Sequence, residues 1–202
     1  MARLLQDLRY AARGFRKSPV FALVAVASLA LGIGANTAIF SLVDRMILRL
    51  LPVKNPQDLV LLWGRGEHYG GNNGIYKLSY PMYADFRDHN SVFSGMFCEF
   101  DTPVTVSFGG RTERIEGQLV SGTYFPVLGV GAALGRVFTP DDDRTVGGHP
   151  VAVISYGYWV GRFAKSRAVI EKKFLLNGYP FTIVGVSQAG FDGTDPVISP
   201  QI

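Results

Sequence analysis

Cysteine and histidine are scarce in this chain. Its 202 residues include one cysteine, Cys98, and three histidines. A single cysteine excludes an internal disulfide framework, so Cys98 is expected to be a small buried side chain. His68, His89 and His149 lie far apart and lack the spacing of metal ligands. These residue types therefore predict no metal site and no cofactor.

Charge is missing altogether from Ser18 to Val43, a run of 26 residues. About 20 apolar residues suffice for a helix to cross a hydrocarbon core of roughly 30 Å, so a transmembrane helix is predicted over 19–43. The small-x-small run Ala25-Val26-Ala27 before Ser28 leaves a cleavable signal peptide as an alternative. An apolar run that continues to Val43 favours an uncleaved anchor, because a secretory apolar region normally ends at its cleavage site.

Residues 1–18 combine basic and apolar residues with helical spacing. The apolar positions are Leu4, Leu5, Leu8, Ala11, Ala12 and Phe15. This pattern predicts a cytoplasmic amphipathic helix in the plane of the membrane surface, with Arg9, Arg13, Arg16 and Lys17 against anionic headgroups. An ordinary solvated helix is the alternative.

The distribution of basic residues predicts the orientation and excludes one class of partner. Five basic residues precede the apolar run, and three, Arg45, Arg49 and Lys54, follow it closely. The positive-inside rule places the N-terminus in the cytoplasm and the main domain in the periplasm. Beyond residue 17 the chain has 15 basic and 15 acidic residues, so no nucleic-acid partner is predicted.

Small and polar residues form a stripe within the apolar run. Ser28, Gly32 and Asn36 are spaced four apart. Such a stripe allows close approach and hydrogen bonding, which predicts packing against another transmembrane helix. The alternative is that Asn36 lies near the lipid headgroups.

Residues 50–202 show a mixture of strand and helix patterns. The predicted strands are Leu59–Trp63 (buried), Val104–Phe108, Arg114–Val120, Val151–Ile154, Lys173–Leu176 and Phe181–Val186. Helices are predicted from Tyr80 to about His89 and from Ser155 to about Lys165. Gly109-Gly110 and Asn177-Gly178 indicate hairpins. Because strands and helices intermix without strict alternation, the fold class is α+β.

The polar residues of this domain suggest no catalytic group. Asp141 to Asp143 could hold a hard cation, but Thr139-Pro140 before them is typical of a helix start with Thr139 as N-cap. Ser155 is interpreted in the same way, because the glycine that a nucleophile elbow requires is absent two residues before it. The glycine-rich residues 64–74 are expected to form a loop.

Five phrases stand out in order along the chain: LLQDLRYAARGFRKSPVFALVAVASLALGIGANTAIFSLV, YPMYADFRDHNSVFSGM, VSGTYFPVLGVGAALGRVFTPDDD, PVAVISYGYWVGRF and LNGYPFTIVGVSQAGFDG. Together they resemble the MacB/FtsX group of ABC transporter permeases, and in particular its MacB-like periplasmic core domain in the subgroup of duplicated permeases. The resemblance implies a first transmembrane helix, a large periplasmic domain and three further transmembrane helices. With no second span before Ile202, the chain is expected to be the front portion of such a permease, with a truncated domain over 50–202.

The resemblance also implies a function at the bacterial inner membrane. The expected role is that of a non-catalytic permease subunit of an efflux or mechanotransmission complex, with a separate ABC ATPase and a second permease half or a homodimer as partners. No G-x-x-x-x-G-K-[ST] phosphate loop occurs in these 202 residues. A membrane-anchored periplasmic interaction module that is not coupled to ATP is the alternative.

Overall fold

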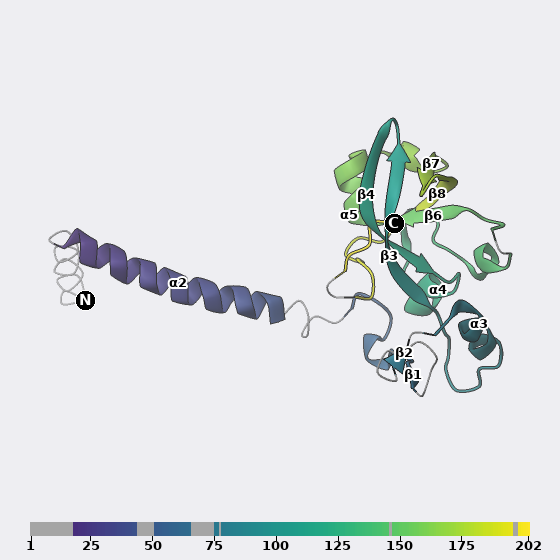
Figure 1. Cartoon of the computed structure of the whole chain (residues 1–202), viewed down its shortest axis with the longest axis horizontal. Helices are drawn as coiled ribbons and strands as arrows, with labels where there is room; N and C mark the ends of the chain where they lie inside the picture. Colours follow the sequence, from purple (N-terminus) through teal and green to yellow (C-terminus); the bar gives the residue numbers. More distant parts are fainter. Residues whose placement is uncertain (1–17, 44–50, 66–74, 77, 146, 196–197) are drawn as a thin grey trace, which may run out of the picture. The chain divides into compact units, whose positions relative to one another are not determined.

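The computed structural model describes residues 18–43, 51–65, 75–76, 78–145, 147–195 and 198–202. The chain divides into two compact units, residues 1–49 and 50–202. In the first unit the structure describes one helix, α2 (Pro19–Val43), at the bounds predicted for the membrane helix (Figure 1). The predicted amphipathic helix over 1–18 lies outside the described residues, apart from Ser18.

A six-stranded sheet forms the centre of the second unit. Its strands are β3 (Glu99–Phe108), β4 (Arg111–Val120), β5 (Ala132–Gly135), β6 (Val151–Ile154), β7 (Lys173–Leu176) and β8 (Tyr179–Ser187). The order is β4-β3-β7-β8-β5, and β6 pairs with β8. The β6–β8 pair is parallel and the other pairs are antiparallel. A small two-stranded sheet, β1 (Gly64–Arg65) with β2 (Ile75–Tyr76), lies outside it.

Both predicted hairpins are confirmed. Gly109 and Gly110, between β3 and β4, have φ angles of 58° and 77°, and Asn177 and Gly178, between β7 and β8, have 51° and 87°. Two successive positive φ angles are what a two-residue type I′ turn requires, which explains why these dipeptides set the hairpins. The strands β3 and β4 run longer than predicted, with ten residues each.

Helices and short 3-10 turns complete the unit, which confirms the α+β class. They are α3 (Tyr80–Asp88), α4 (Tyr124–Leu128), α5 (Tyr156–Phe163), η2 (Pro56–Asp58), η3 (Pro140–Asp143) and η4 (Arg167–Val169). Ser79 caps α3 by accepting a hydrogen bond from the Met82 N–H at 3.5 Å. Proline at the first turn of α3 loses no hydrogen bond there, and the helix lies within the predicted range.

The interior of this unit consists of two apolar clusters. The first contains Val104, Val106, Ala152, Ile154, Trp159, Val169, Phe174, Ile183 and Val186. The second contains Tyr124, Phe125, Leu128, Val130, Val153 and Phe191. Neighbouring residues of β6, Val153 and Ile154, belong to different clusters, because successive side chains of a strand point to opposite faces.

Two burial predictions are wrong. Residues 59–63 form no strand, and the side chains of Val60, Leu61, Leu62 and Trp63 are 64, 74, 43 and 53% exposed. Pairing begins only at Gly64, opposite Tyr76, so the apolar residues before it have no strand to cover them among the described residues. Cys98 is half-buried rather than buried.

Candidate membrane anchor and polar clusters

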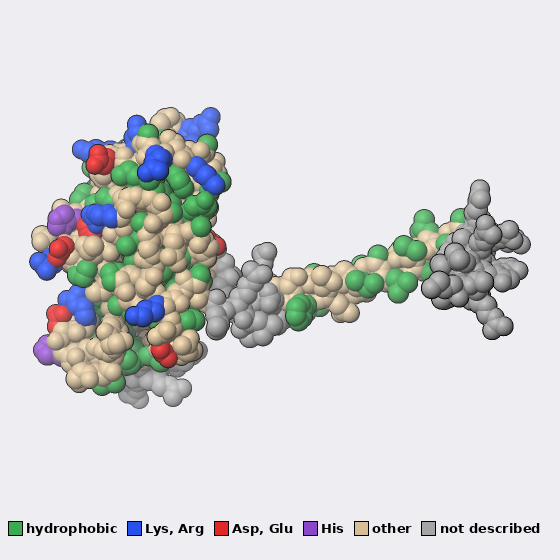
Figure 2. All heavy atoms as spheres, turned by 180° about the vertical axis from the view of Figure 1, so that it is seen from behind, with side chains coloured by type: hydrophobic (Ala, Val, Ile, Leu, Met, Phe, Trp, Pro, Cys, Tyr) green, Lys and Arg blue, Asp and Glu red, His purple; other side chains and the backbone are tan. Residues whose placement is uncertain are grey.

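The helix α2 has the length and composition of a membrane span. Its 25 residues extend about 37 Å at 1.5 Å per residue, which exceeds the roughly 30 Å of a hydrocarbon core. Pro19–Ser41 has a mean hydropathy of 1.9 and none of it is buried. Figure 2 shows apolar side chains along this helix and no acidic or basic ones. Among the described residues it is the one helix that could cross a membrane by length and composition.

The stripe predicted for helix packing lies along one side of α2. Ser28, Gly32 and Asn36 are exposed, and a Cβ added at Gly32 would have no heavy atom within 4 Å. The Thr37 hydroxyl donates to the Ile33 carbonyl at 2.8 Å, which satisfies one polar group within the helix. Packing of the stripe on another helix stays a prediction. Arg9, Arg13, Arg16 and Lys17 lie outside the described residues.

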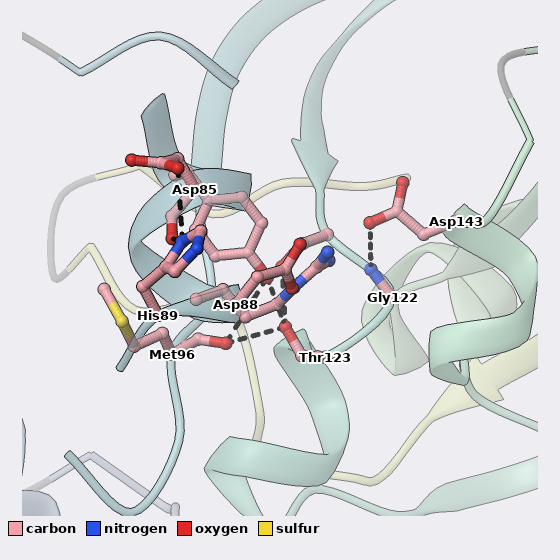
Figure 3. A network of polar contacts seen from close by, with 10 residues as sticks. Asp85, Asp88, His89, Met96, Gly122, Thr123 and Asp143 are labelled. Carbon is pink, nitrogen blue, oxygen red and sulfur yellow. Dashed lines mark hydrogen bonds and ion pairs between the residues drawn. The ribbon is translucent and has the colours of Figure 1, made fainter. Parts of the chain in front are cut away.

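A hydrogen-bond network fixes α3 to the start of α4 (Figure 3). The hydroxyl of Tyr83, which is 4% exposed, lies 2.7 Å from Thr123 Oγ1. The Thr123 hydroxyl donates to the Met96 carbonyl at 2.8 Å. Ser121 Oγ accepts from the Cys98 N–H at 3.1 Å and lies 3.0 Å from Thr123 Oγ1. These polar groups satisfy one another, so the arrangement positions structural elements and does not present a nucleophile.

Each acid in 141–143 contacts a donor of this chain. Asp142 accepts two hydrogen bonds from the Arg136 guanidinium, at 2.6 and 2.8 Å, and one from the Thr139 N–H at 2.9 Å. The bonds from Arg136 lower the pKa of Asp142 to about 2. Asp143 accepts from the Gly122 N–H at 3.0 Å, and Asp141 pairs with Arg144 at 2.9 Å.

These contacts favour the helix-start interpretation over the cation site. Thr139 occupies the N-cap of η3, as predicted. Asp142, three residues on, reaches back to the N-cap N–H, which is the reciprocal bond of a capping box. In the described part of the chain, no group of three or more His, Cys, Asp or Glu could hold a metal ion.

Helix α5 is capped at its start and joined to the sheet by hydrogen bonds farther along. Ser155 is its N-cap, as predicted, and accepts from the Tyr158 N–H at 3.2 Å. Farther along, the Tyr158 hydroxyl and Arg162 Nε donate to the same oxygen of Glu113, on β4, at 2.6 and 3.0 Å. These hydrogen bonds lower the pKa of Glu113. Polar side chains of α5 therefore hold this helix against β4.

A second polar cluster joins the C-terminal segment to the sheet, and the sequence did not suggest it. The Thr194 hydroxyl donates to both carboxylate oxygens of Glu99, 2.5 and 2.6 Å away. On the neighbouring strand, Gln118 Nε2 donates to Asp101 at 2.9 Å, and Gln118 Oε1 accepts from the Tyr124 hydroxyl at 3.0 Å. Burial raises the pKa of Glu99. The alternation of Glu99 and Asp101 along β3 is a sequence signal that could have indicated this polar face.

One cavity of this unit is lined mainly by apolar side chains. Its volume is about 170 Å³, and its lining includes residues of both apolar clusters, such as Val104, Tyr124 and Phe191. Gln118, Ser155 and Ser187 are the polar side chains besides the Tyr124 hydroxyl, and no lining side chain among the described residues is acidic or basic.

Comparison with known protein families identifies the family of this chain. The model of the MacB-like periplasmic core domain matches residues 22–200. The chain belongs to this family. The resemblance inferred from the sequence phrases is therefore confirmed.

Two solved structures are similar to this MacB-like chain. The periplasmic region of MacB from Actinobacillus actinomycetemcomitans is 19% identical with a TM-score of 0.48, over 64% of this chain and 60% of that one. The extracellular domain of the noncanonic ABC-type transporter YknZ from Gram-positive bacteria is 21% identical with a TM-score of 0.40, over 47% and 49%. The chain thus covers less than two thirds of either structure. Among curated proteins, no sequence matches it.

Within this MacB-like chain, the described residues bring the predicted site residues together only in part. Ser28, Gly32 and Asn36 share one helix and one face. The polar groups that hold α3, α5 and the C-terminal segment come from distant parts of the sequence, such as Glu99 and Thr194. Sequence patterns of local spacing could find the first group and could not find the second.

Proposed function

We propose that this chain is a non-catalytic permease subunit, or the front portion of one, of an ABC-type efflux or mechanotransmission complex. The observation that carries the proposal is the family match over 22–200, which begins within α2 and continues through the α+β unit. An uncharged 25-residue helix directly ahead of such a domain supports an anchored role.

ATP hydrolysis in this proposal belongs to a separate ABC ATPase. The 202 residues contain no phosphate-binding loop, and the polar clusters of the described residues are used for docking helices and the C-terminal segment. The chain would receive the conformational signal through α2 and move its second unit. A homodimer or a second permease half would supply the neighbouring transmembrane helix.

The orientation is tested by labelling single cysteines in a Cys98→Ala background with a membrane-impermeant maleimide. Cysteines would replace Ser18 and Tyr179, which is 72% exposed on β8. In intact cells with a permeabilised outer membrane, Tyr179→Cys is expected to be labelled and Ser18→Cys only after lysis. Labelling of Tyr179→Cys only after lysis would place the domain in the cytoplasm and refute the proposed permease role.

Packing of α2 on another helix is tested by two glycine variants. Gly32→Leu fills the small-residue face, whereas Gly34→Leu makes the same change about 200° around the helix; neither position has a neighbour within 4 Å in the chain itself. In a membrane two-hybrid assay with the intact chain, Gly32→Leu should lower the association signal and Gly34→Leu should not. Equal signals for both would refute the stripe as a contact surface.

A further inference from the structure

Four consecutive apolar residues protrude from the second unit. We call Val60, Leu61, Leu62 and Trp63 the VLLW segment; their exposed fractions run from 43 to 74%. It is not part of a helix or strand. Large apolar side chains that gather on a surface generally mark a site of contact with a protein or a membrane.

The number of residues between α2 and this segment sets an upper limit on their separation. Just before it, the second unit holds the chain at two points: the Lys54 N–H donates to the Leu128 carbonyl at 2.8 Å, and Gln188 Nε2 donates to the Pro52 carbonyl at 3.2 Å. From Val43, the end of α2, to Pro52 there are nine residue steps, which cover about 32 Å at most even when fully extended. Val60 follows Lys54 by six residues, of which three form η2.

The residue types of the segment, and the basic residues that precede it, fit contact with a lipid surface. Tryptophan is enriched at the membrane–water interface, where its apolar ring and N–H each find suitable surroundings, and leucine and valine partition into the acyl boundary. The connecting residues 44–54 carry three basic side chains, Arg45, Arg49 and Lys54, against one acidic side chain, Asp44. The net positive charge of residues 44–54 favours anionic lipid headgroups.

We propose that the VLLW segment inserts into the headgroup–acyl boundary of the membrane that α2 crosses. The second unit would then have a shallow lipid contact in addition to the covalent anchor, and this contact would restrict its orientation relative to the bilayer. The inference rests on the proposed anchoring by α2 and goes beyond it, because an anchored domain needs no lipid contact of its own.

The test uses the full chain in vesicles of phosphatidylethanolamine and phosphatidylglycerol. A single cysteine replaces Leu61 in the Cys98→Ala background and carries an environment-sensitive fluorophore. Tyr179→Cys is the matched control, since Tyr179 and Leu61 are 72 and 74% exposed. Leu31→Cys, near the middle of α2, reports on insertion of the anchor separately. Because Leu61 and Tyr179 protrude, labels at these sites disturb no packing.

The quencher that reaches each label decides the outcome. We expect lipids with a shallow nitroxide to quench the Leu61 label at least twofold more than the Tyr179 label, and iodide in solution to show the opposite preference. Equal quenching at both sites, with the Leu31 label quenched by deep nitroxide lipids, would overturn the inference while the anchor stands. A Leu61 label shielded from both iodide and lipid would also overturn it, because a protein would then cover the segment. A Leu31 label outside the bilayer would refute the anchor itself.

Discussion

The two units place the same kinds of side chain in opposite surroundings. In α2, Val20 and Leu31 are each 76% exposed, whereas Leu128, Ile154 and Val186 in the second unit are fully buried. The sheet unit surrounds its apolar residues with polar ones, whereas α2 has no charged residue and few polar ones. An apolar side chain contributes favourably only when it leaves water, so the second unit buries its own core and α2 requires lipid or another helix.

Polar groups follow the same division. The α-helical backbone of α2 satisfies its amide groups internally, which is a requirement in lipid. In the second unit, hydroxyls and carboxylates join segments that are far apart in sequence, as Tyr83 and Thr123 do across 40 residues. The first unit thus depends on its length and apolarity, and the second on specific contacts.

Charges in the middle of α2 should have the largest effect. In the variant Leu29→Arg with Leu31→Arg, each arginine near the bilayer centre costs about 3 kcal/mol, which gives roughly 6 kcal/mol against insertion. We expect the chain to move from the membrane fraction resistant to carbonate extraction into the extractable fraction. Alanine at the same two positions is the control and should leave the chain integral. Retention of the arginine variant would contradict the assignment of α2 as a span.

A cavity in the interior of the second unit should have the next largest effect. Leu128→Ala removes a fully buried side chain of the second cluster and should lower the free energy of unfolding by about 2–5 kcal/mol. The measurement is denaturant unfolding of the full chain in detergent, followed by the fluorescence of buried Trp159. Leu31→Ala makes the same chemical change in α2 and should leave this transition unchanged. Equal shifts for the two variants would remove the contrast between the units.

Local sequence signals predicted the parts of this fold that local physics determines. Asn177-Gly178 is sufficient for a turn because the two positive φ angles are needed at those two residues alone. Ser155 and Thr139 cap their helices through residues three positions away. The uncharged run over 18–43 likewise needs no tertiary information to be read as a helix of membrane length.

The remaining features depend on which distant segments meet. An apolar run such as Leu59–Trp63 has strand propensity, but a strand forms only where another strand pairs with it. In this chain pairing with β2 begins at Gly64. The bond between Glu99 and Thr194 spans 95 residues, and the parallel pairing of β6 with β8 skips β7. No spacing rule within one segment contains that information. Packing of the stripe of Ser28, Gly32 and Asn36 remains a prediction for the same reason, because it depends on a second helix. The role of the basic residues before it remains a prediction because they lie outside the described residues.

The ion pair at η3 should give a smaller, pH-dependent effect that α2 cannot show. Because Arg136 lowers the pKa of Asp142 from 3.8 to about 2, the folded state favours the carboxylate. Its contribution is complete above about pH 4 and is lost as the pH falls towards 2. Asp142→Asn should therefore lower the free energy of unfolding at pH 7 by about 1–2 kcal/mol, a range reduced by the half-exposed Arg136.

Denaturant unfolding between pH 7 and pH 3 checks this expectation. The difference between the natural chain and Asp142→Asn should shrink as the pH decreases. Asp141→Asn is the control, because the exposed Asp141–Arg144 pair should contribute little. A constant difference across this range would show that the capping bond of Asp142, and not its charge, stabilises η3.

The smallest expected effect has the opposite sign. Burial raises the pKa of Glu99, so the folded state prefers the protonated carboxyl. Stability should decrease as the pH rises from the ordinary glutamate pKa through the raised one, since the native state then binds more protons than the unfolded chain. Glu99→Gln keeps an oxygen for the Thr194 hydroxyl and has no charge to bury, so it should be at least as stable as the natural chain at pH 8.

Urea unfolding at pH 5 and pH 8 measures this slope, with the exposed Glu116→Gln of β4 as the control. The gap between Glu99→Gln and the natural chain should widen in favour of the variant at pH 8, by less than the Asp142 effect. A gap that widens in favour of the natural chain would mean that the charge on Glu99 strengthens its bonds to Thr194 by more than burial costs. The C-terminal segment would then depend on an ionised carboxylate at neutral pH, and its attachment to the sheet would weaken with acid instead of strengthening.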